Sequence, residues 1–163
     1  MPLFVAALAP LEYSFPIDAA LKALKFKRRL DYAPAFAELL RRMISQLPDD
    51  IDALLPVPLH WRRHAMRGFN QAVELCGPLR KQMGLPVLSN LKRVKATSKQ
   101  SGLDANERRR NLQHAFVATA PVEMRHVLII DDVITTGETC RQLATVVLAA
   151  GAKKVSVLAV ARA

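Results

Sequence analysis

Cysteines and long apolar runs are scarce in this chain. It has two cysteines in 163 residues, Cys76 and Cys140, and no CxxC pair. We therefore expect no disulfide framework and no zinc site, but two reduced thiols in a cytoplasmic protein. No apolar run reaches the roughly 18 residues that a membrane helix needs, and no basic segment precedes the apolar N-terminus. Neither a membrane span nor a signal peptide is expected.

Acidic residues are also few relative to basic ones, and the imbalance is local. The chain carries 24 Lys and Arg against 14 Asp and Glu, a formal net charge of +10. Residues 61–126 hold 13 of the basic residues and only four of the acidic ones. This central excess favours a polyanionic ligand, either nucleic acid or a phosphorylated small molecule. A solvated basic face that aids solubility is the alternative, and charge alone does not separate the three.

The hydrophobic pattern alternates between helical and strand-like segments. Hydrophobic residues make up 51% of the chain, which is enough for one buried core, so a single domain over 1–163 is expected. Helices are predicted at 18–30, 33–47, 69–83 and 138–150, and strands at 51–57, 86–94, 115–119, 127–130 and 155–161. The alternation predicts an α/β fold with a mainly parallel twisted sheet and helices on both of its faces.

Local signals add detail to this pattern. Asp18 suits the N-cap of the first helix, and Pro78 predicts a kink or break in the third. Residues 59–68 are predicted to form a basic loop. Residues 95–111 carry many charges and little apolar content, which is typical of a long mobile loop with a functional role.

The segment VLIIDDVITTGET, residues 127–139, joins an apolar strand to two acids and a loop of hydroxyls. Ligands of parallel sheets bind beyond the carboxyl ends of strands, where Asp131 and Asp132 lie. Such acids accept hydrogen bonds from sugar hydroxyls or hold a hydrated divalent cation, and alternation sends them to opposite faces. The loop Thr135-Thr136-Gly137-Glu138-Thr139 offers backbone N–H groups and the start of a helix, which bind phosphate. The order indicates a sugar-phosphate site.

Three other interpretations of this segment were weighed. A P-loop needs the pattern GxxxxGK[ST], and the chain has no such run. A receiver-type phosphoacceptor has several βα units after its acids, whereas one helix and one strand follow Asp132. A capped helix after a buried strand explains Thr135 and Thr136, but it leaves two unpaired acids at an apolar strand end.

These residues resemble the signature of type I phosphoribosyltransferases for 5-phosphoribosyl 1-diphosphate (PRPP). The segments RGFNQ at 67–71, KATSKQSGLDANERRRNLQHAF at 95–116 and the closing VSVLAVARA are similar to the ComF/GntX subfamily. So is LKALKFKRRLDYAPAFAELL at 21–40, and the resemblance covers nearly the whole chain from about Tyr13. It implies a phosphoribosyltransferase-like fold in which residues 1–48 form a helical hood segment.

The resemblance also implies a role for particular residues. Asp131 and Asp132 would contact the ribose hydroxyls and, directly or indirectly, Mg²⁺, while residues 135–139 would wrap the 5-phosphate. The loop of Val57, Pro58 and Leu59 would face the diphosphate, with Arg63, Arg67 and Gln71 nearby. Residues 95–110 would close over the site. Arg67 and Lys99 are the candidate catalytic residues, and Arg108, Arg109 and Arg110 are further sources of charge on closure or a solvated basic loop.

Many members of the subfamily begin with a zinc-ribbon module that carries paired CxxC motifs. This chain has none and starts where such a module would end, so no zinc site is carried over. His60 and His64 have the i,i+4 spacing of a zinc-binding helix, but the segment is not convincingly helical and no third ligand is evident, which favours loop histidines. Trp61, beside Arg62, either stacks on a base or packs on the fold.

Two functions follow from the sequence. One is PRPP-dependent transfer of phosphoribose to a nitrogen acceptor with Mg²⁺, in purine or nucleotide metabolism. The other is an accessory role in DNA uptake, in which the protein binds single-stranded DNA or the uptake machinery and keeps the PRPP site for regulation or as a vestige. A homodimer is a family-level expectation. The acceptor is not identified by the sequence.

Overall fold

A parallel sheet forms the centre of the molecule. The computed structural model describes residues 3–95 and 115–163. Within them, five strands share one sheet in the order β1-β7-β6-β3, with β2 also on β7, and every pairing is parallel. The strands are β1 (Ala7–Leu8), β2 (Leu11–Glu12), β3 (Ala53–Pro56), β6 (His126–Ile134) and β7 (Lys154–Arg162). This arrangement confirms the predicted fold class.

Strands β6 and β7 are the longest strands of this sheet and hold it together. They pair from His126 opposite Lys154 to Ile134 opposite Arg162. Helix α6 (Glu138–Ala149) connects them, so the predicted strand–helix–strand unit is confirmed. Both strands are almost continuously apolar because both of their faces are covered.

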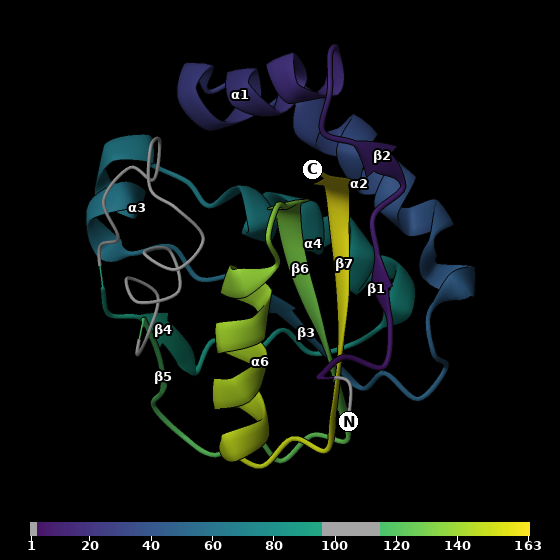
Figure 1. Cartoon of the computed structure of the whole chain (residues 1–163), viewed down its shortest axis with the longest axis vertical. Helices are drawn as coiled ribbons and strands as arrows, with labels where there is room; N and C mark the ends of the chain where they lie inside the picture. The colour runs from purple at the N-terminus through teal and green to yellow at the C-terminus, as the bar shows by residue number, and fades with distance from the viewer. Residues whose placement is uncertain (1–2, 96–114) are drawn as a thin grey trace.

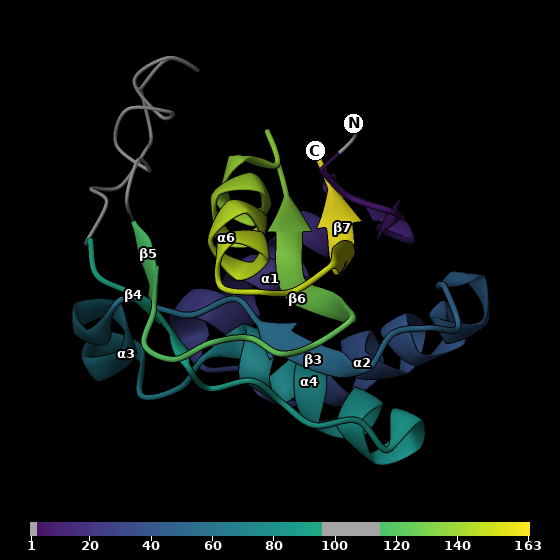
Figure 2. The same cartoon turned by 90° about the horizontal axis from the view of Figure 1, so that it is seen from below.

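Helices cover the two faces of the sheet (Figures 1 and 2). Val127 and Ile129 pack on one face with Leu143 and Val147 of α6. The opposite face belongs to a second core cluster, which includes Leu128 and residues of α1 (Ile17–Lys27), α2 (Tyr32–Arg42) and α4 (Gln71–Met83). A short 3₁₀ helix, η1 (Ile44–Gln46), follows α2. In Figure 1, α1 lies across the upper end of the sheet, where the arrows of β6 and β7 point.

Strands β4 (Leu91–Arg93) and β5 (Phe116–Ala118) form a separate antiparallel pair. The expected strand at 86–94 is therefore shorter than predicted, with an isolated bridge from Val87 to Leu54 before it. The predicted mobile loop 95–111 lies outside the described residues except for Lys95.

Three local predictions are wrong. The basic segment 59–68 is not a loop but holds helix α3 (Trp61–Arg67). Asp18 is not an N-cap; α1 starts after Pro16, and Asp18 pairs with Lys22 within the first turns at 2.7 Å. Helix α4 runs through Pro78, so the predicted break is wrong, whereas the alternative of a kink stays a prediction; Leu75 and Leu79 beside the proline are buried.

A buried polar network joins the amino ends of three strands. His126 is fully buried; its Nδ1 lies 2.6 Å from Asp50 Oδ1 and its Nε2 lies 2.8 Å from Ser156 Oγ. The second Asp50 oxygen accepts from Lys154 Nζ at 2.7 Å. Asp52 accepts hydrogen bonds from the backbone N–H groups of Arg125 and His126. His126, which has no distinctive sequence context, thus ties the segment before β3 to β6 and β7.

The network predicts a specific sensitivity to acid. Hydrogen bonds from Lys154 and His126 lower the pKa of Asp50 to about 2. A lowered folded-state pKa means that the stabilisation is present above the unfolded value near 3.8 and is lost as pH falls through about 2. Asp50→Asn should flatten this part of the pH dependence, measured as urea midpoints between pH 5 and pH 2. Asp49→Asn, at an exposed neighbour, should keep the wild-type profile.

Candidate functional site

The two acids of the quoted segment lie in the last part of β6. Strand β3 pairs with β6 only as far as Ile130, whereas β7 stays paired to Ile134. Asp131 and Asp132 are therefore the first residues of β6 beyond the end of β3. Asp132 contacts α1 on one face, and Asp131 contacts Cys140 of α6 on the other. The prediction that the two acids serve opposite faces is confirmed.

Each carboxylate is held by the backbone that follows it. Asp131 Oδ1 accepts from the N–H of Asp132 at 2.8 Å, and Asp132 Oδ1 accepts from the N–H of Val133 at 2.9 Å. Burial, assisted by the negative charge of Asp132, raises the pKa of Asp131 well above its usual range. A positive group that arrives at Asp131 would lower this pKa again, because it favours the ionised carboxylate.

The loop after β6 presents backbone donors at the start of α6. Thr135 and Thr136 are exposed, and Gly137 adopts a left-handed φ of 74° as the N-cap residue. No side chain caps the helix; the Thr136 hydroxyl accepts only a long bond of 3.4 Å from the N–H of Glu138. Glu138 turns along the helix and accepts from Gln142. The loop thus keeps the open N–H groups and partial positive charge that favour phosphate.

The predicted diphosphate loop follows β3 directly. Val57 donates its N–H to the carbonyl of Ile130, which fixes the loop beside the acids. Asn70 holds it from the other side: its Nδ2 donates to the Val57 carbonyl at 3.0 Å, and its Oδ1 accepts from Ala72 N–H and caps α4. Asn70, in the RGFNQ segment, therefore positions Val57, Pro58 and Leu59. The sequence contained this residue in a motif but did not show its role.

Helix α3 exists because both of its ends are capped. His60 is buried, and its Nδ1 accepts from the N–H of Arg62, while Gly68 ends the helix with φ of 78°. His60 is thus a capping residue and not a loop histidine. Among the residues that the structure describes, no three His, Cys, Asp or Glu side chains gather to hold a metal ion by themselves.

Arginines from α3 and β4 lie within electrostatic range of the two acids. Arg67 is half-buried, donates to Gln71 Oε1 at 3.1 Å and lies over the Phe26 ring at 5.2 Å. Burial and the nearby charge of Arg63 lower the pKa of Arg67, and Asp132 opposes this. Arg93, which was not predicted as a site residue, has its pKa lowered to about 10 by burial and by Arg63, with Asp131 acting in the opposite direction. In the sequence, the position of Arg93 just before a long basic loop could have pointed to it.

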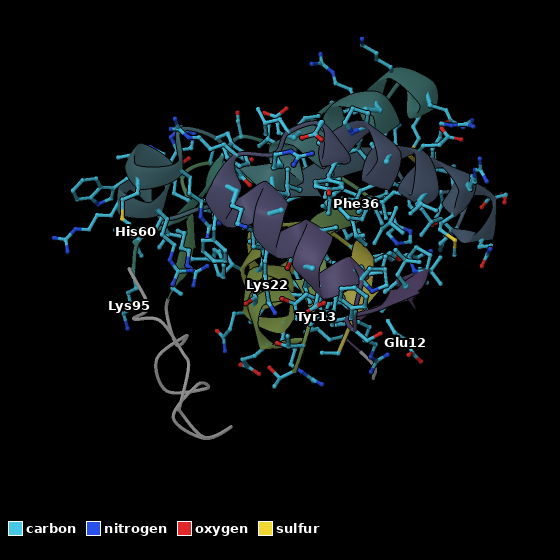
Figure 3. All side chains as sticks on the ribbon, turned by 90° about the horizontal axis from the view of Figure 1, so that it is seen from above. Glu12, Tyr13, Lys22, Phe36, His60 and Lys95 are labelled. Atoms are coloured by element: carbon cyan, nitrogen blue, oxygen red, sulfur yellow. The ribbon has the colours of Figure 1, made fainter. Side chains whose placement is uncertain are left out.

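Helix α1 lies next to the end of β6 and contributes a residue that the sequence did not indicate. Lys25 Nζ lies 2.6 Å from Asp132 Oδ2, with only 20% of the Lys25 side chain and 6% of the Asp132 side chain exposed. Figure 3 looks down onto α1, with Lys22 labelled on this helix and His60 marking the start of α3 to one side. The predicted catalytic residue Lys99, and Arg108 to Arg110, lie outside the described residues.

Two hollows flank this arrangement. One, of about 460 Å³, is lined by Thr135, Thr136, Gly137 and Arg141 together with apolar residues of β1. The other, of about 790 Å³, is lined by Pro58, Trp61 and Arg93, among others. Each hollow shares a wall with one of the two predicted phosphate-binding loops.

Gly68 provides a test of how α1 and α3 are joined. Arg28 Nε donates to the carbonyl of Arg67 at 2.9 Å, and a Cβ at Gly68 would lie 2.5 Å from the Arg28 guanidinium. Gly68→Ala should lower the free energy of unfolding by roughly 1–2 kcal/mol for its φ, and by more for displacing Arg28. Gly84→Ala, with φ of 65° and open space, should show the φ cost alone. Equal losses in thermal melts would contradict the packing role of Arg28.

Comparison of the sequence with known proteins finds relatives named for DNA use. No protein-family model matches the chain. DNA utilization protein YhgH of Escherichia coli strain K12 is 41% identical over 160 residues, which cover 93% of this chain and 69% of the relative. Competence protein F of Haemophilus influenzae is 34% identical over 163 residues, which cover 93% of this chain and 70% of the relative.

Solved structures are similar in fold. The chain matches Bacillus subtilis glutamine PRPP amidotransferase, in a complex with ADP and GMP, with a TM-score of 0.57 and 18% identity. The match covers 86% of this chain but only 30% of the amidotransferase chain. The chain also matches adenine phosphoribosyltransferase of Leishmania tarentolae, with a TM-score of 0.50 and 15% identity over 96% of this chain and 91% of that one. At such identities the likeness shows the type I phosphoribosyltransferase fold alone. None of the helices in the described part of the chain has the length and hydropathy to span a bilayer.

Proposed function

The chain belongs to the ComF family, which includes DNA utilization protein YhgH and competence protein F, and from that premise we propose that it binds PRPP and transfers its phosphoribosyl group to a nitrogen acceptor. One observation carries the proposal. The acids of β6 and the uncapped start of α6 lie at the carboxyl end of the sheet, and Arg67 of α3 and Arg93 of β4 are within electrostatic range of the acids. Acceptors for ribose hydroxyls thus lie next to donors for a phosphate, which is what a sugar phosphate requires.

Each part of the ligand has a counterpart in this arrangement. The ribose hydroxyls donate to Asp131 and Asp132, whose first oxygens are already fixed by the backbone. The 5-phosphate accepts from the N–H groups between Thr135 and Thr139. The diphosphate lies along Val57 to Leu59, where Arg67 is within electrostatic reach of Asp132.

The residues also suit the bond changes. The bond from C1 of the ribose to the diphosphate oxygen breaks with both electrons on the oxygen, and the acceptor nitrogen then bonds to C1 and loses its proton. Arg67 and Arg93 stabilise the negative charge that develops on the departing diphosphate. Asp131 and Asp132 stabilise the oxocarbenium-like sugar. Pre-formed donors give this stabilisation without reorganisation at the moment of reaction.

The donor set fits Mg²⁺ in one particular way. Magnesium ions commonly bind one or two protein carboxylates plus the phosphates of the substrate. Asp131 offers an oxygen whose contact, the Cys140 thiol at 3.9 Å, is a weak one. When bound, Mg²⁺ would neutralise charge on the diphosphate. Asp131 is the residue that would hold it directly, and Asp132, which is paired with Lys25, would act on it indirectly.

Calorimetry tests the binding step. PRPP with Mg²⁺ should bind the wild type, and Asp131→Asn/Asp132→Asn should weaken binding by at least about tenfold, because the negative charges and one acceptor oxygen of each side chain are lost. The matched control is Asp49→Asn/Glu123→Gln, which removes two exposed acids and should bind as the wild type does. Wild-type affinity in the site variant would disprove the assignment of the acids. A screen of bases and amines for PRPP-dependent diphosphate release then tests transfer.

A second candidate function, binding of single-stranded DNA, is favoured by the surface of α3. Trp61 is 66% exposed, and the guanidinium of Arg62 lies over its ring at 5.3 Å. Exposed aromatic rings beside cations form the platforms on which bases stack. The names of the relatives, DNA utilization protein and competence protein, agree with such a role. This role is compatible with PRPP binding at the neighbouring site.

Fluorescence anisotropy with a labelled oligonucleotide distinguishes stacking from charge. Trp61→Ala should weaken binding by about 1–3 kcal/mol, the usual worth of one stacked base, without changing the slope of log affinity against log salt. Phe15→Ala, at a ring that is 84% exposed on another part of the molecule, is the control. Binding that is absent at low salt, or equal in both variants, would argue against α3 as the DNA surface.

A further inference from the structure

The ion pair between Lys25 and Asp132 connects helix α1 to the end of β6. With Nζ to Oδ2 at 2.6 Å, it joins two side chains that are mostly withdrawn from water. The other oxygen of Asp132 accepts from the N–H of Val133. One oxygen of this carboxylate therefore accepts a backbone hydrogen bond, and the other has Lys25 as its ion-pair partner but no hydrogen bond within the described part of the chain.

Asp131 is in a different state. Its Oδ1 accepts from the N–H of Asp132, but its Oδ2 meets the thiol of Cys140 at 3.9 Å. A thiol is only a weak hydrogen-bond donor, and weaker still at that distance. The adjacent acids are thus unequal: one has a cation, and the other keeps an oxygen without a strong partner.

Lys25 is fixed in place by its neighbours on α1. Arg28, at the end of the same helix, donates to the Arg67 carbonyl, and the Phe26 ring lies under the Arg67 guanidinium. The other lysines of the helix are placed differently: Lys22 pairs with Asp18 in its own helix, and Lys27 is exposed. Lys25 differs from these surface lysines because it pairs with a buried acid of another element, where water screens the charges less.

We propose that Lys25 is a positioning residue that takes the place of a divalent cation at Asp132 and leaves Asp131 as the carboxylate open to Mg²⁺. The inference rests on the proposed PRPP site and deepens it. Lys25 brings a positive charge from the protein to one of two neighbouring carboxylates at the end of an apolar strand. Asp132 is then pre-oriented as an acceptor for a ribose hydroxyl, and the ligand needs fewer metal ions to bind.

Titration with Mn²⁺ alone, without PRPP, measures this directly. Lys25→Met should bind Mn²⁺ about tenfold more tightly than the wild type, because Asp132 becomes available beside Asp131. Lys25→Arg, which keeps the charge, should bind as the wild type does. Lys27→Met removes the same charge from an exposed position of the same helix and is the matched control. Equal Mn²⁺ affinity in Lys25→Met and Lys27→Met would overturn the proposal.

PRPP binding supplies the second readout. In Lys25→Met, PRPP affinity at low Mg²⁺ should fall about tenfold and recover as Mg²⁺ rises, with uptake of about one ion more than in the wild type. Identical Mg²⁺ dependence in the two proteins would overturn the proposal while PRPP binding stands. If the wild type does not bind PRPP at any Mg²⁺ concentration, the proposed function fails, and the Mn²⁺ titration still decides the role of Lys25.

Removal of Lys25 alone leaves a buried carboxylate without its partner, which can destabilise the protein. Lys25→Met/Asp132→Asn avoids this by making both side chains neutral. It should fold with a melting temperature near that of the wild type and lose the extra Mn²⁺ affinity of Lys25→Met. Retention of the tighter Mn²⁺ binding in the double variant would show that the ion does not use Asp132, and would overturn the proposal.

Discussion

Burial of β6 on both faces is the constraint on which the rest of the structure depends. Because β6 pairs with β7 and β3 and has helices on either side, Val127 to Ile130 have no solvent-exposed surface. A charge in that stretch would cost several kcal/mol unless it were paired. The first position at which β6 can carry acids is where β3 stops, and Asp131 and Asp132 stand there. The place of these two candidate site residues thus follows from the limits of the core.

The same strand geometry gives the two acids different neighbours. Because successive side chains point to opposite faces, Asp132 meets the α1 side and Asp131 meets the α6 side. One acid is neutralised by Lys25 and the other lies beside an uncharged thiol. Identical residues in adjacent positions therefore differ in their partners and in their availability to a ligand. The asymmetry arises from the pleat and does not require a difference in sequence.

The elements that the sequence predicted well are those with strong apolar patterns. β6, α6 and β7 were predicted within a few residues at their ends, because their patterns of burial leave few alternatives. Helix α3 was missed because WRRHAMR has no apolar stripe; its caps at His60 and Gly68 and its contact with Arg28 stabilise it instead. Lys25 and Arg93 were missed as site residues because only the folded chain brings them near the acids. Residues 131–139 could be proposed as site residues from the sequence because they are contiguous, and that assignment stays a prediction.

Polar groups at the two ends of the sheet are satisfied in different ways, and this separates structure from function. At the amino end, His126, Asp50, Asp52 and Ser156 satisfy one another with short hydrogen bonds, and such a closed network adds rigidity but offers nothing to a ligand. At the carboxyl end, the start of α6 has no capping side chain and Asp131 keeps one weakly engaged oxygen. Open donors and acceptors on rigid elements favour binding, because a ligand completes the hydrogen bonds without reordering the protein. The anchored amino end thus holds the strands whose other ends carry the site.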